Sequence, residues 1–159
     1  VIMVSTARNG KQNVMSMSWH TMMEFEPPLV GFVMSDQNYS FSLLKATQEC
    51  VINIPTVEIA EKVVGCGHIH GAKINKFEKF GLTPKPAASV KAPLVDECYA
   101  NFECRIVDTK MVARYGFFVV EVVNAWMNPA VKNPQTLHHI GKENFMIAGK
   151  RIRVKSKIK

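Results

Sequence analysis

The sequence lacks the short motifs that identify several common enzyme classes. It has no Gly-x-Gly-x-x-Gly, no Gly-x-x-x-x-Gly-Lys and no Gly-x-Ser-x-Gly. These absences argue against Rossmann dehydrogenases, P-loop enzymes and serine hydrolases, although a nucleotide-like cofactor held by other means stays open. The acidic residues are scattered over expected turns and helix faces, so hydrolysis by a pair of carboxylates is poorly supported.

Cysteine and long apolar runs are also scarce. The four cysteines form no Cys-x-x-Cys pair, so we expect free thiols rather than a disulfide scaffold. No apolar run approaches the roughly 20 residues that span a bilayer. The opening Val1-Ile2-Met3-Val4 shows no basic-then-apolar leader. We therefore expect a soluble cytoplasmic protein with no membrane partner.

The composition is that of an ordinary globular domain. Of the 159 residues, 47% are hydrophobic and 21% are charged, and a chain of this length buries roughly 70% of its unfolded surface without metal or disulfides. No repeat or low-complexity linker divides it, so we expect residues 1–159 to form a single domain.

Positive charge is concentrated at the C-terminal end. Residues 142–159 hold seven basic side chains and one acidic side chain of a chain whose net charge is +7. We expect a basic tail from about residue 150, and the alternation from Lys150 to Lys155 is typical of a solvated edge strand. Attraction of an anionic ligand is the alternative. The tail after Arg151 has no aromatic side chains, so we expect no nucleic-acid partner.

Periodicity predicts many short strands and few short helices. A turn at Asn9-Gly10 joins the first two strands. We expect strands over 1–7, 13–22, 29–34, 49–54, 100–108, 117–126 and 145–148, and helices over 40–47, 57–64 (capped by Thr56 and ended by Gly65) and 73–80. The fold class is therefore mainly β, a small closed β-barrel with helical insertions.

The segment Cys66-Gly67-His68-Ile69-His70 allows two interpretations. On a strand, residues 66, 68 and 70 would share one face and could bind zinc or copper. The surrounding glycines instead favour a flexible loop, and no fourth ligand is indicated. We therefore expect no metal.

Several segments in order resemble the FMN-binding split-barrel, flavin reductase-like family, most closely its flavoredoxin and ferric reductase branch. The resemblance covers about residues 1–126. Its residues are Asn13-Val14-Met15-Ser16-Met17-Ser18-Trp19, Pro27-Pro28-Leu29-Val30, Asn38-Tyr39-Ser40, Val51-Ile52-Asn53-Ile54-Pro55, Asn75-Lys76-Phe77, and Gly81-Leu82-Thr83-Pro84 with Ala92-Pro93.

The resemblance implies a Greek-key-like split barrel that binds FMN at the interface of a homodimer. Backbone groups from Met15 to Ser18, among them Ser16, and the Asn13 side chain would contact the edge of the flavin ring, and Trp19 would pack against it. Ser40 and Lys76 would bind the phosphate. The remaining implied cofactor residues are Asn38, Asn53, Tyr115 and Phe145.

Two departures from the family pattern concern the phosphate. His70-Gly71-Ala72 replaces a Ser-Gly-Arg run, and Asn38 replaces an arginine that often precedes the phosphate-binding Ser/Thr. The loss of two arginines would weaken phosphate binding or shift it to Lys76 and the C-terminal basic residues.

The resemblance implies an oxidoreductase that takes electrons from NAD(P)H or a redox partner. It would pass them through FMN to free flavin, ferric iron or a redox protein. No side chain need act as acid or base, so we expect no catalytic residue. The alternative is a non-enzymatic protein that binds a tetrapyrrole or nucleotide-like ligand in the same barrel.

Overall fold

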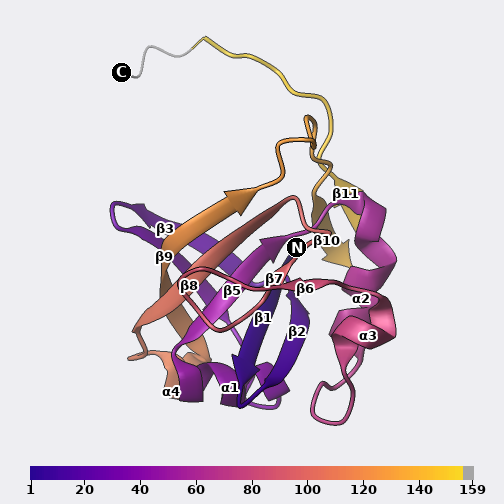
Figure 1. Ribbon diagram of the computed structural model, residues 1–159. Coiled ribbons are helices and arrows are strands. Elements are labelled where there is room, and N and C mark those ends of the chain that lie inside the picture. The colour runs from indigo at the N-terminus through magenta and orange to yellow at the C-terminus, as the bar shows by residue number, and fades with distance from the viewer. Residues whose placement is uncertain (156–159) are drawn as a thin grey trace.

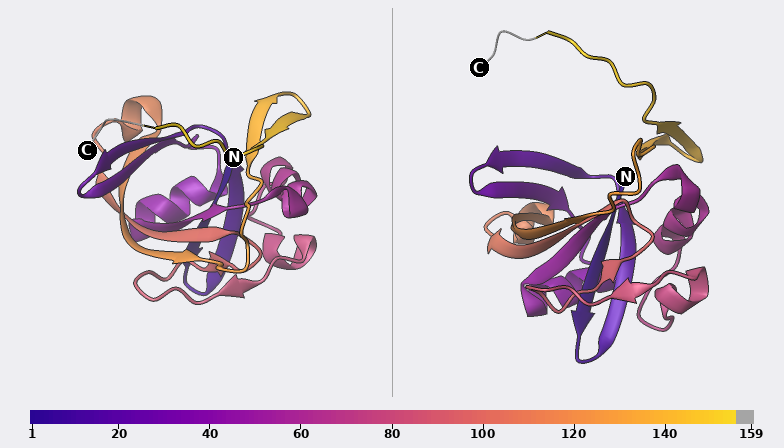
Figure 2. Two further views of the ribbon diagram at one scale, coloured as in Figure 1. Left: turned by 90° about the horizontal axis from the view of Figure 1, so that it is seen from above. Right: turned by 45° about the horizontal axis from the view of Figure 1, so that its top comes forward.

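The computed structural model describes residues 1–155, and its largest element is one antiparallel sheet. The order of the seven strands is β2-β1-β5-β8-β9-β4-β3. Their bounds are β1 Ile2–Arg8, β2 Lys11–Met17, β3 His20–Phe25, β4 Pro28–Val33, β5 Glu49–Ile54, β8 Ala100–Asp108 and β9 Phe117–Met127. The two edge strands, β2 and β3, are consecutive in the chain, so the sheet must curl round to bring its edges near each other (Figures 1 and 2). The result is a barrel open along one seam. This confirms the split barrel that the family resemblance implies and corrects the closed barrel that periodicity alone predicted, because β2 and β3 do not pair.

The connections also confirm the expected Greek-key-like pattern. Strands β5, β8 and β9 follow one another as antiparallel neighbours, and β9 then pairs with the earlier strand β4. Four strands in this spatial order form a Greek key. The Asn9-Gly10 turn joins β1 to β2 with positive φ angles of 51° and 77°, as a two-residue hairpin requires.

Helix α1 (Tyr39–Thr47) packs against the curled sheet and fills its interior (Figure 2, left). Leu43 and Leu44 are buried, and Phe41 is half-buried. The ring of Phe41 meets that of Phe118 edge-on with centroids 5.4 Å apart, and Phe32 lies 5.8 Å from the same ring. These aromatic contacts hold α1 in place beside the seam.

A second apolar cluster lies between the β1–β2 hairpin and two short helices, α2 (Ala60–His68) and α3 (Lys76–Phe80). A 3-10 turn, η1 (Val57–Ile59), leads into α2. Gly65 allows α2 to approach α3 closely, because a Cβ there would lie 2.3 Å from the Phe80 ring. The last residue of α3 is thereby packed against α2.

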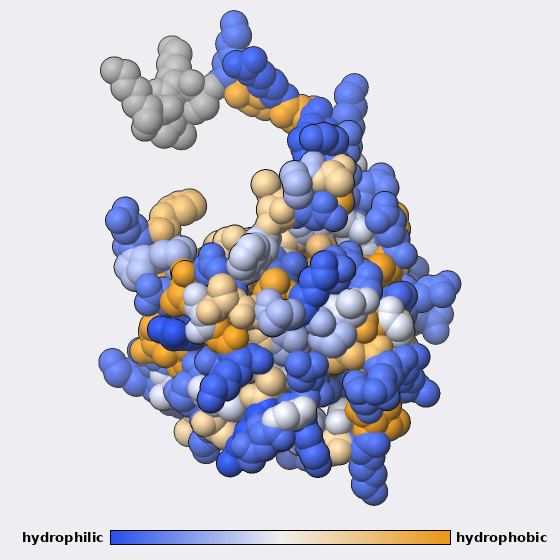
Figure 3. Space-filling model, in the orientation of Figure 1, coloured by the Kyte–Doolittle hydropathy of each residue, from blue (hydrophilic) through white to orange (hydrophobic). Residues whose placement is uncertain are grey.

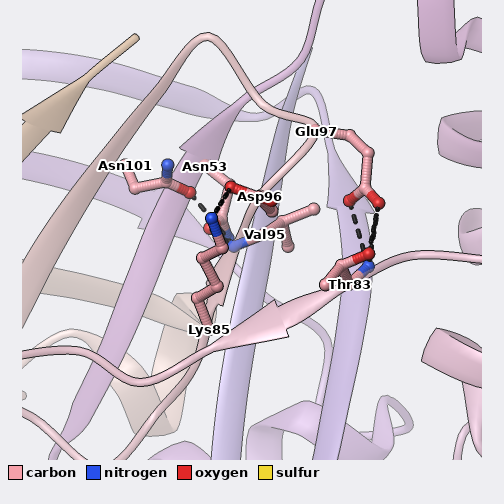
Figure 4. Close-up of polar contacts among 7 residues, drawn as sticks. All are labelled: Asn53, Thr83, Lys85, Val95, Asp96, Glu97 and Asn101. Atoms are coloured by element: carbon pink, nitrogen blue, oxygen red, sulfur yellow. Dashed lines mark hydrogen bonds and ion pairs between the residues drawn. The ribbon is translucent and has the colours of Figure 1, made fainter.

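The segment between α3 and β8 is anchored by side chains (Figure 4). It contains two short strands, β6 (Pro84–Lys85) and β7 (Leu94–Val95). The Val95 amide donates to Asn53 Oδ1 over 3.0 Å and to Asn101 Oδ1 over 3.1 Å. Lys85 pairs with Asp96 at 2.7 Å, and Glu97 accepts hydrogen bonds from Thr83.

The structure corrects several expected boundaries. The strand expected over 13–22 is two strands, β2 and β3, because the chain leaves one edge of the sheet at Ser18-Trp19 and enters the other. Gly65 does not end the second helix, which continues to His68, and Thr56 forms no side-chain cap. The third helix begins at Lys76 rather than at residue 73 and is capped by Asn75.

The C-terminal part differs most from expectation. A hairpin of β10 (Leu137–Gly141) and β11 (Asn144–Ile147) replaces the single short strand, and α4 (Val112–Tyr115) precedes β9. Residues 151–155 are exposed and form no strand, contrary to the edge-strand interpretation. The basic side chains of Lys157 and Lys159 lie outside the described residues. Within residues 1–155, no helix has the length and apolar character needed to cross a membrane.

Candidate functional site

A large cleft of about 1050 Å³ opens at the barrel seam. Three segments form it: the crossing from β2 to β3, the chain from the end of β4 to α1, and the region of α4. Its lining is Met15–Trp19, 33–36, Asn38, Phe41, Lys45, Gln48, Thr109, 112–116, Phe118 and His139. A cleft of this size is at the upper end of the range for small-molecule and cofactor sites.

A second, narrow cavity adjoins the cleft, because Met15 and Asn38 line both. It lies between the start of α1, the end of α2 and the loop that precedes α3. Its other lining residues are Asn13, Tyr39, Ser40, Cys66, Gly67, Ile69, His70, Gly71 and Lys76. No Asp or Glu lines this cavity, so its lining offers positive charge and polar donors to an anion.

Lys76 is the charged group of the narrow cavity. Its side chain is 3% exposed, and its Nζ donates to the Cys66 carbonyl oxygen over 2.6 Å. Among residues 1–155, no carboxylate lies within 4.0 Å of this ammonium. Burial lowers the pKa of Lys76. A buried cation is usually paired with an anion, so Lys76 is poised to bind one.

Asn13 lies beside Lys76 in the same cavity. Its Nδ2 donates to Ser40 Oγ over 2.8 Å, while its buried Oδ1 has no hydrogen-bond donor among the described residues. The loop at Gly71 covers this oxygen so closely that a Cβ at Gly71 would lie 2.1 Å from it. A ligand hydroxyl between the loop and Asn13 would supply the missing donor.

The narrow cavity has a volume of only about 30 Å³, which is the space of one water molecule. A phosphate group is larger, so its entry beside Lys76 requires the 69–75 loop to move away from Asn13. Residues 70 and 72–75 of that loop are exposed, and the segment contains no helix or strand. Exposed segments without regular secondary structure are where local opening costs least, so this loop is the part of the cavity wall best suited to move.

Most of the sequence-predicted cofactor residues lie together at these two cavities. The structure brings nine of the eleven to their walls: Asn13, Met15, Ser16, Ser18, Trp19, Asn38, Ser40, Lys76 and Tyr115. Trp19 is 73% exposed at the crossing between β2 and β3. The hydroxyl of Ser16 donates to the Val63 carbonyl oxygen. Their individual contacts with a cofactor stay predictions.

The other two predicted residues, Asn53 and Phe145, line neither cavity. The Asn53 amide is fully used within the fold: Nδ2 donates to Met3 O, Ser5 Oγ and Val51 O, and Oδ1 accepts from Val95 (Figure 4). Phe145 packs against His139 with ring centroids 5.1 Å apart, and only His139 reaches the cleft.

The structure contradicts the interpretation that residues 66, 68 and 70 lie on one face of a strand and bind a metal. Cys66 and His68 belong to α2, whose helical spacing does not place alternate residues on one face. Among the described residues, no three His, Cys, Asp or Glu side chains gather as metal ligands would. The loop interpretation is also wrong for Cys66 and His68, which continue the helix, and burial raises the pKa of the Cys66 thiol to about 11.

Sequence reasoning missed the cationic residues of the large cleft. Lys45 on α1 and Arg114 on α4 both line it, and the Arg114 guanidinium lies 5.1 Å from the centroid of the Tyr115 ring. A lysine in the last turn of a predicted helix gives no signal of a site. Arg114 falls in a helix that the periodicity did not predict.

The residues of the two cavities offer contacts to a ligand with three chemically different parts. The narrow cavity offers Lys76 to an anionic end and Asn13 Oδ1 to a hydroxyl. The large cleft offers methionines, an exposed tryptophan and backbone groups to a flat ring. FMN has these parts in this order: a phosphate, a hydroxylated chain and a flat ring with polar edges. The residues present therefore fit this cofactor.

Comparisons with known proteins agree with this geometry. The sequence model described as "Flavin reductase like domain" matches residues 1–145. A protein from Archaeoglobus fulgidus is 37% identical over 123 residues, which are 77% of this chain and 70% of that protein.

Two solved structures share the fold. The FMN-binding domain of a flavin reductases-like enzyme from Shewanella baltica has a TM-score of 0.91 at 24% identity, covering 97% of this chain and 88% of the other. Flavoredoxin of Desulfovibrio vulgaris has a TM-score of 0.87 at 19% identity, covering 99% and 90%.

Proposed function

The chain belongs to the flavin reductase like domain family, and from this premise we propose that it is an FMN-binding oxidoreductase. It takes electrons from NAD(P)H or a redox protein and passes them to free flavin, ferric iron or a second redox protein. The observation that supports this most strongly is that the ammonium group of Lys76 is buried and forms no ion pair with a described carboxylate. The cavity that it lines adjoins a cleft large enough for a flavin ring. In a domain of this family, such a cation is best explained as the binding site of the cofactor phosphate.

Different residues of the site bind different parts of FMN. Lys76 neutralises the phosphate and Ser40 offers its hydroxyl beside it, because both line the narrow cavity. Asn13 Oδ1 accepts a hydrogen bond from a hydroxyl of the connecting chain. The backbone from Met15 to Ser18 meets the polar edge of the ring, and Trp19 covers part of the ring.

The bound FMN would supply the electron-transfer chemistry. The protein residues position the ring, exclude water from one side and leave the other side open to the donor or acceptor. Lys45 and Arg114 outweigh the single carboxylate among the described residues of the cleft, Asp36, and this excess of positive charge would attract anionic donors such as pyridine nucleotides. No acid or base from the chain is required.

The same proposal includes a homodimer with the cleft at its interface. All six residues of β3 are exposed, and the strand is an edge of the sheet (Figures 1 and 2). Three large apolar side chains of this strand reach solvent: Met22 is 69%, Met23 47% and Phe25 93% exposed. Trp19 of the cleft directly precedes the strand, so a second subunit on β3 would also cover the cleft.

Apolar residues also reach the surface beyond β3. On β9, Val123, Trp126 and Met127 are exposed. Figure 3 shows apolar atoms gathered on the side of the molecule where Figure 1 places β8 and β9. This surface adds to what a partner subunit could bury.

The four cysteines are all unpaired, which supports the expected cytoplasmic location.

The proposal is tested by titrating the purified protein with FMN while flavin fluorescence is followed. We expect quenching, a yellow complex that co-elutes on gel filtration, and loss of the yellow colour when NADH or NADPH is added without oxygen. An acceptor screen then compares free flavin with ferric iron. Failure of the protein to bind FMN would overturn the proposal, whereas bleaching only by a chemical reductant would assign the donor role to a redox protein.

A further inference from the structure

The loop before α3 contains a side chain that the proposed function leaves without a role. His70 lines the narrow cavity together with Lys76, whereas His68, two residues earlier, lines neither cavity. The two histidines are both exposed and lie on the same short stretch of chain. Only one of them is therefore placed to meet a ligand.

Two contacts orient the His70 ring. Its Nδ1 accepts from the Ala72 backbone amide at 3.4 Å. The ring lies 6.2 Å from the Tyr39 ring, at an interplanar angle of 49°. An Nδ1 that accepts a hydrogen bond has no proton, so the proton of the neutral ring is on Nε2. That N–H has no protein acceptor among the described residues and remains available to a ligand.

The surroundings of His70 favour an anion as that ligand. The other titratable groups that line the cavity are Lys76, Cys66 and Tyr39, and no carboxylate lines it. The Cys66 thiol is neutral at physiological pH because burial raises its pKa to about 11. Lys76 supplies the charge, but a lysine binds an anion as a single point and leaves other oxygen atoms free. An N–H donor from the loop that precedes α3 would bind one of them.

We propose that His70 is a specificity-determining residue that donates from Nε2 to the cofactor phosphate, so that the protein selects FMN over riboflavin. The proposal rests on the proposed FMN site. His70 lies on the loop that must move to admit the phosphate, so its hydrogen bond forms when the loop settles on the bound group. Riboflavin has the same ring and chain but no phosphate, so it gains nothing from His70.

The test compares FMN and riboflavin dissociation constants, measured by quenching of flavin fluorescence. Four proteins are compared: the wild type, His70→Ala, His70→Gln and His68→Ala. The loss of one hydrogen bond predicts that His70→Ala weakens FMN binding about three- to ten-fold and leaves riboflavin binding unchanged. His70→Gln keeps an N–H donor and should recover part of the FMN affinity. His68→Ala should match the wild type.

The outcomes separate this proposal from the proposed function. If the wild type binds FMN and His70→Ala binds it equally well, the role of His70 is wrong while the FMN site stands. Equal weakening of FMN and riboflavin would also overturn the proposal, because it would show a general effect on the loop. If the wild type binds neither flavin, the proposed function and this role fail together.

Discussion

The Nζ of Lys76 and the carbonyl oxygen of Cys66 lie 2.6 Å apart, and this is the hydrogen bond that the buried ammonium makes within residues 1–155. A carbonyl dipole compensates a buried charge only in part. The charge of Lys76 therefore lowers the stability of the free protein, and a bound anion would compensate this charge. This balance leads to two predictions.

The first prediction concerns cofactor affinity. Lys76→Met should weaken FMN binding about 10- to 100-fold, because a hydrogen bond to a charged group contributes about 1.5–3 kcal/mol. The measurement is a fluorescence titration with FMN. Lys79→Met provides the control, since Lys79 is an exposed residue of the same helix and lines neither cavity. Equal affinities for the two variants would contradict the placement of the phosphate beside Lys76.

The second prediction concerns pH. The pKa of Lys76 is lowered by burial in the folded protein, so the unfolded chain binds more protons than the native state at alkaline pH. The destabilisation caused by Lys76 should therefore be at its full size at neutral pH. It should disappear as the pH rises through the lowered pKa towards the ordinary value of 10.5. Urea unfolding at pH 7 and pH 10 should show Lys76→Met more stable than the wild type at pH 7, with a smaller difference at pH 10. A difference that grows with pH would refute this.

A third prediction contrasts two glycines of α2. Glycine-to-alanine changes in a helix normally stabilise by up to about 1 kcal/mol. At Gly65 the new Cβ would lie 2.3 Å from the Phe80 ring, and overpacking of this kind costs about 1–3 kcal/mol. Gly65→Ala should therefore destabilise the protein. At Gly67 the nearest atom would be the Ser16 Cβ at 3.6 Å, an ordinary contact, so Gly67→Ala should stabilise it in chemical denaturation.

A fourth prediction concerns Glu103, which is buried in the sheet. Burial acts to raise its pKa, but hydrogen bonds outweigh burial and lower it. The donors are the Trp126 indole at 2.6 Å, the Asn124 amide at 3.1 Å, and the backbone amides of Ala88 and Ser89. The stability from this carboxylate is complete above its ordinary pKa of 4.5 and is lost as the pH falls through the lowered value.

Glu103→Gln should therefore lose about 1–3 kcal/mol at pH 7, because one of its amide hydrogens would face these donors. The loss should shrink in strongly acidic solution, where the wild type is protonated too. Thermal unfolding between pH 7 and pH 3 measures both effects. Glu58→Gln, at an exposed position in η1, should show neither.

The fifth prediction tests the subunit interface. Phe25→Asp places a charge on the 93%-exposed side chain at the end of β3 and should convert a dimer to a monomer in light scattering coupled to gel filtration. FMN affinity should fall at the same time, because the cleft loses its cover. Ile152→Asp changes a 79%-exposed side chain in the C-terminal segment and should leave the dimer intact. A monomeric wild type would disprove the interface.

The sequence predicted the strands well where the pattern is local. The Asn9-Gly10 turn and the apolar strand after Pro28 are at the expected positions, because turn chemistry and strand alternation act over a few residues. It did not predict the break at Ser18-Trp19. Alternation is the same whether a strand continues or crosses to the far edge of a barrel, and only the closure of the whole sheet determines the crossing.

Glycine misled the interpretation of α2 for a related reason. Gly65 usually signals the end of a helix, but here it serves a contact with Phe80, which follows 15 residues later. The family resemblance also implies Asn53 as a cofactor residue; it lines neither cavity, and its amide forms hydrogen bonds with Met3, Ser5, Val51 and Val95, so a cofactor contact of Asn53 stays a prediction. Long-range partners of this kind have no sequence signal.

The crossing from β2 to β3 sets a mechanical limit on the protein. Ser18 and Trp19 are the two residues between β2 and β3, so this short connection limits how far the two edges of the sheet can separate at this end of the seam. The chain cannot open the seam further without breaking strand pairs at one edge. One residue added here would lengthen the connection by up to about 3.6 Å and would let this end of the seam widen for a larger ligand.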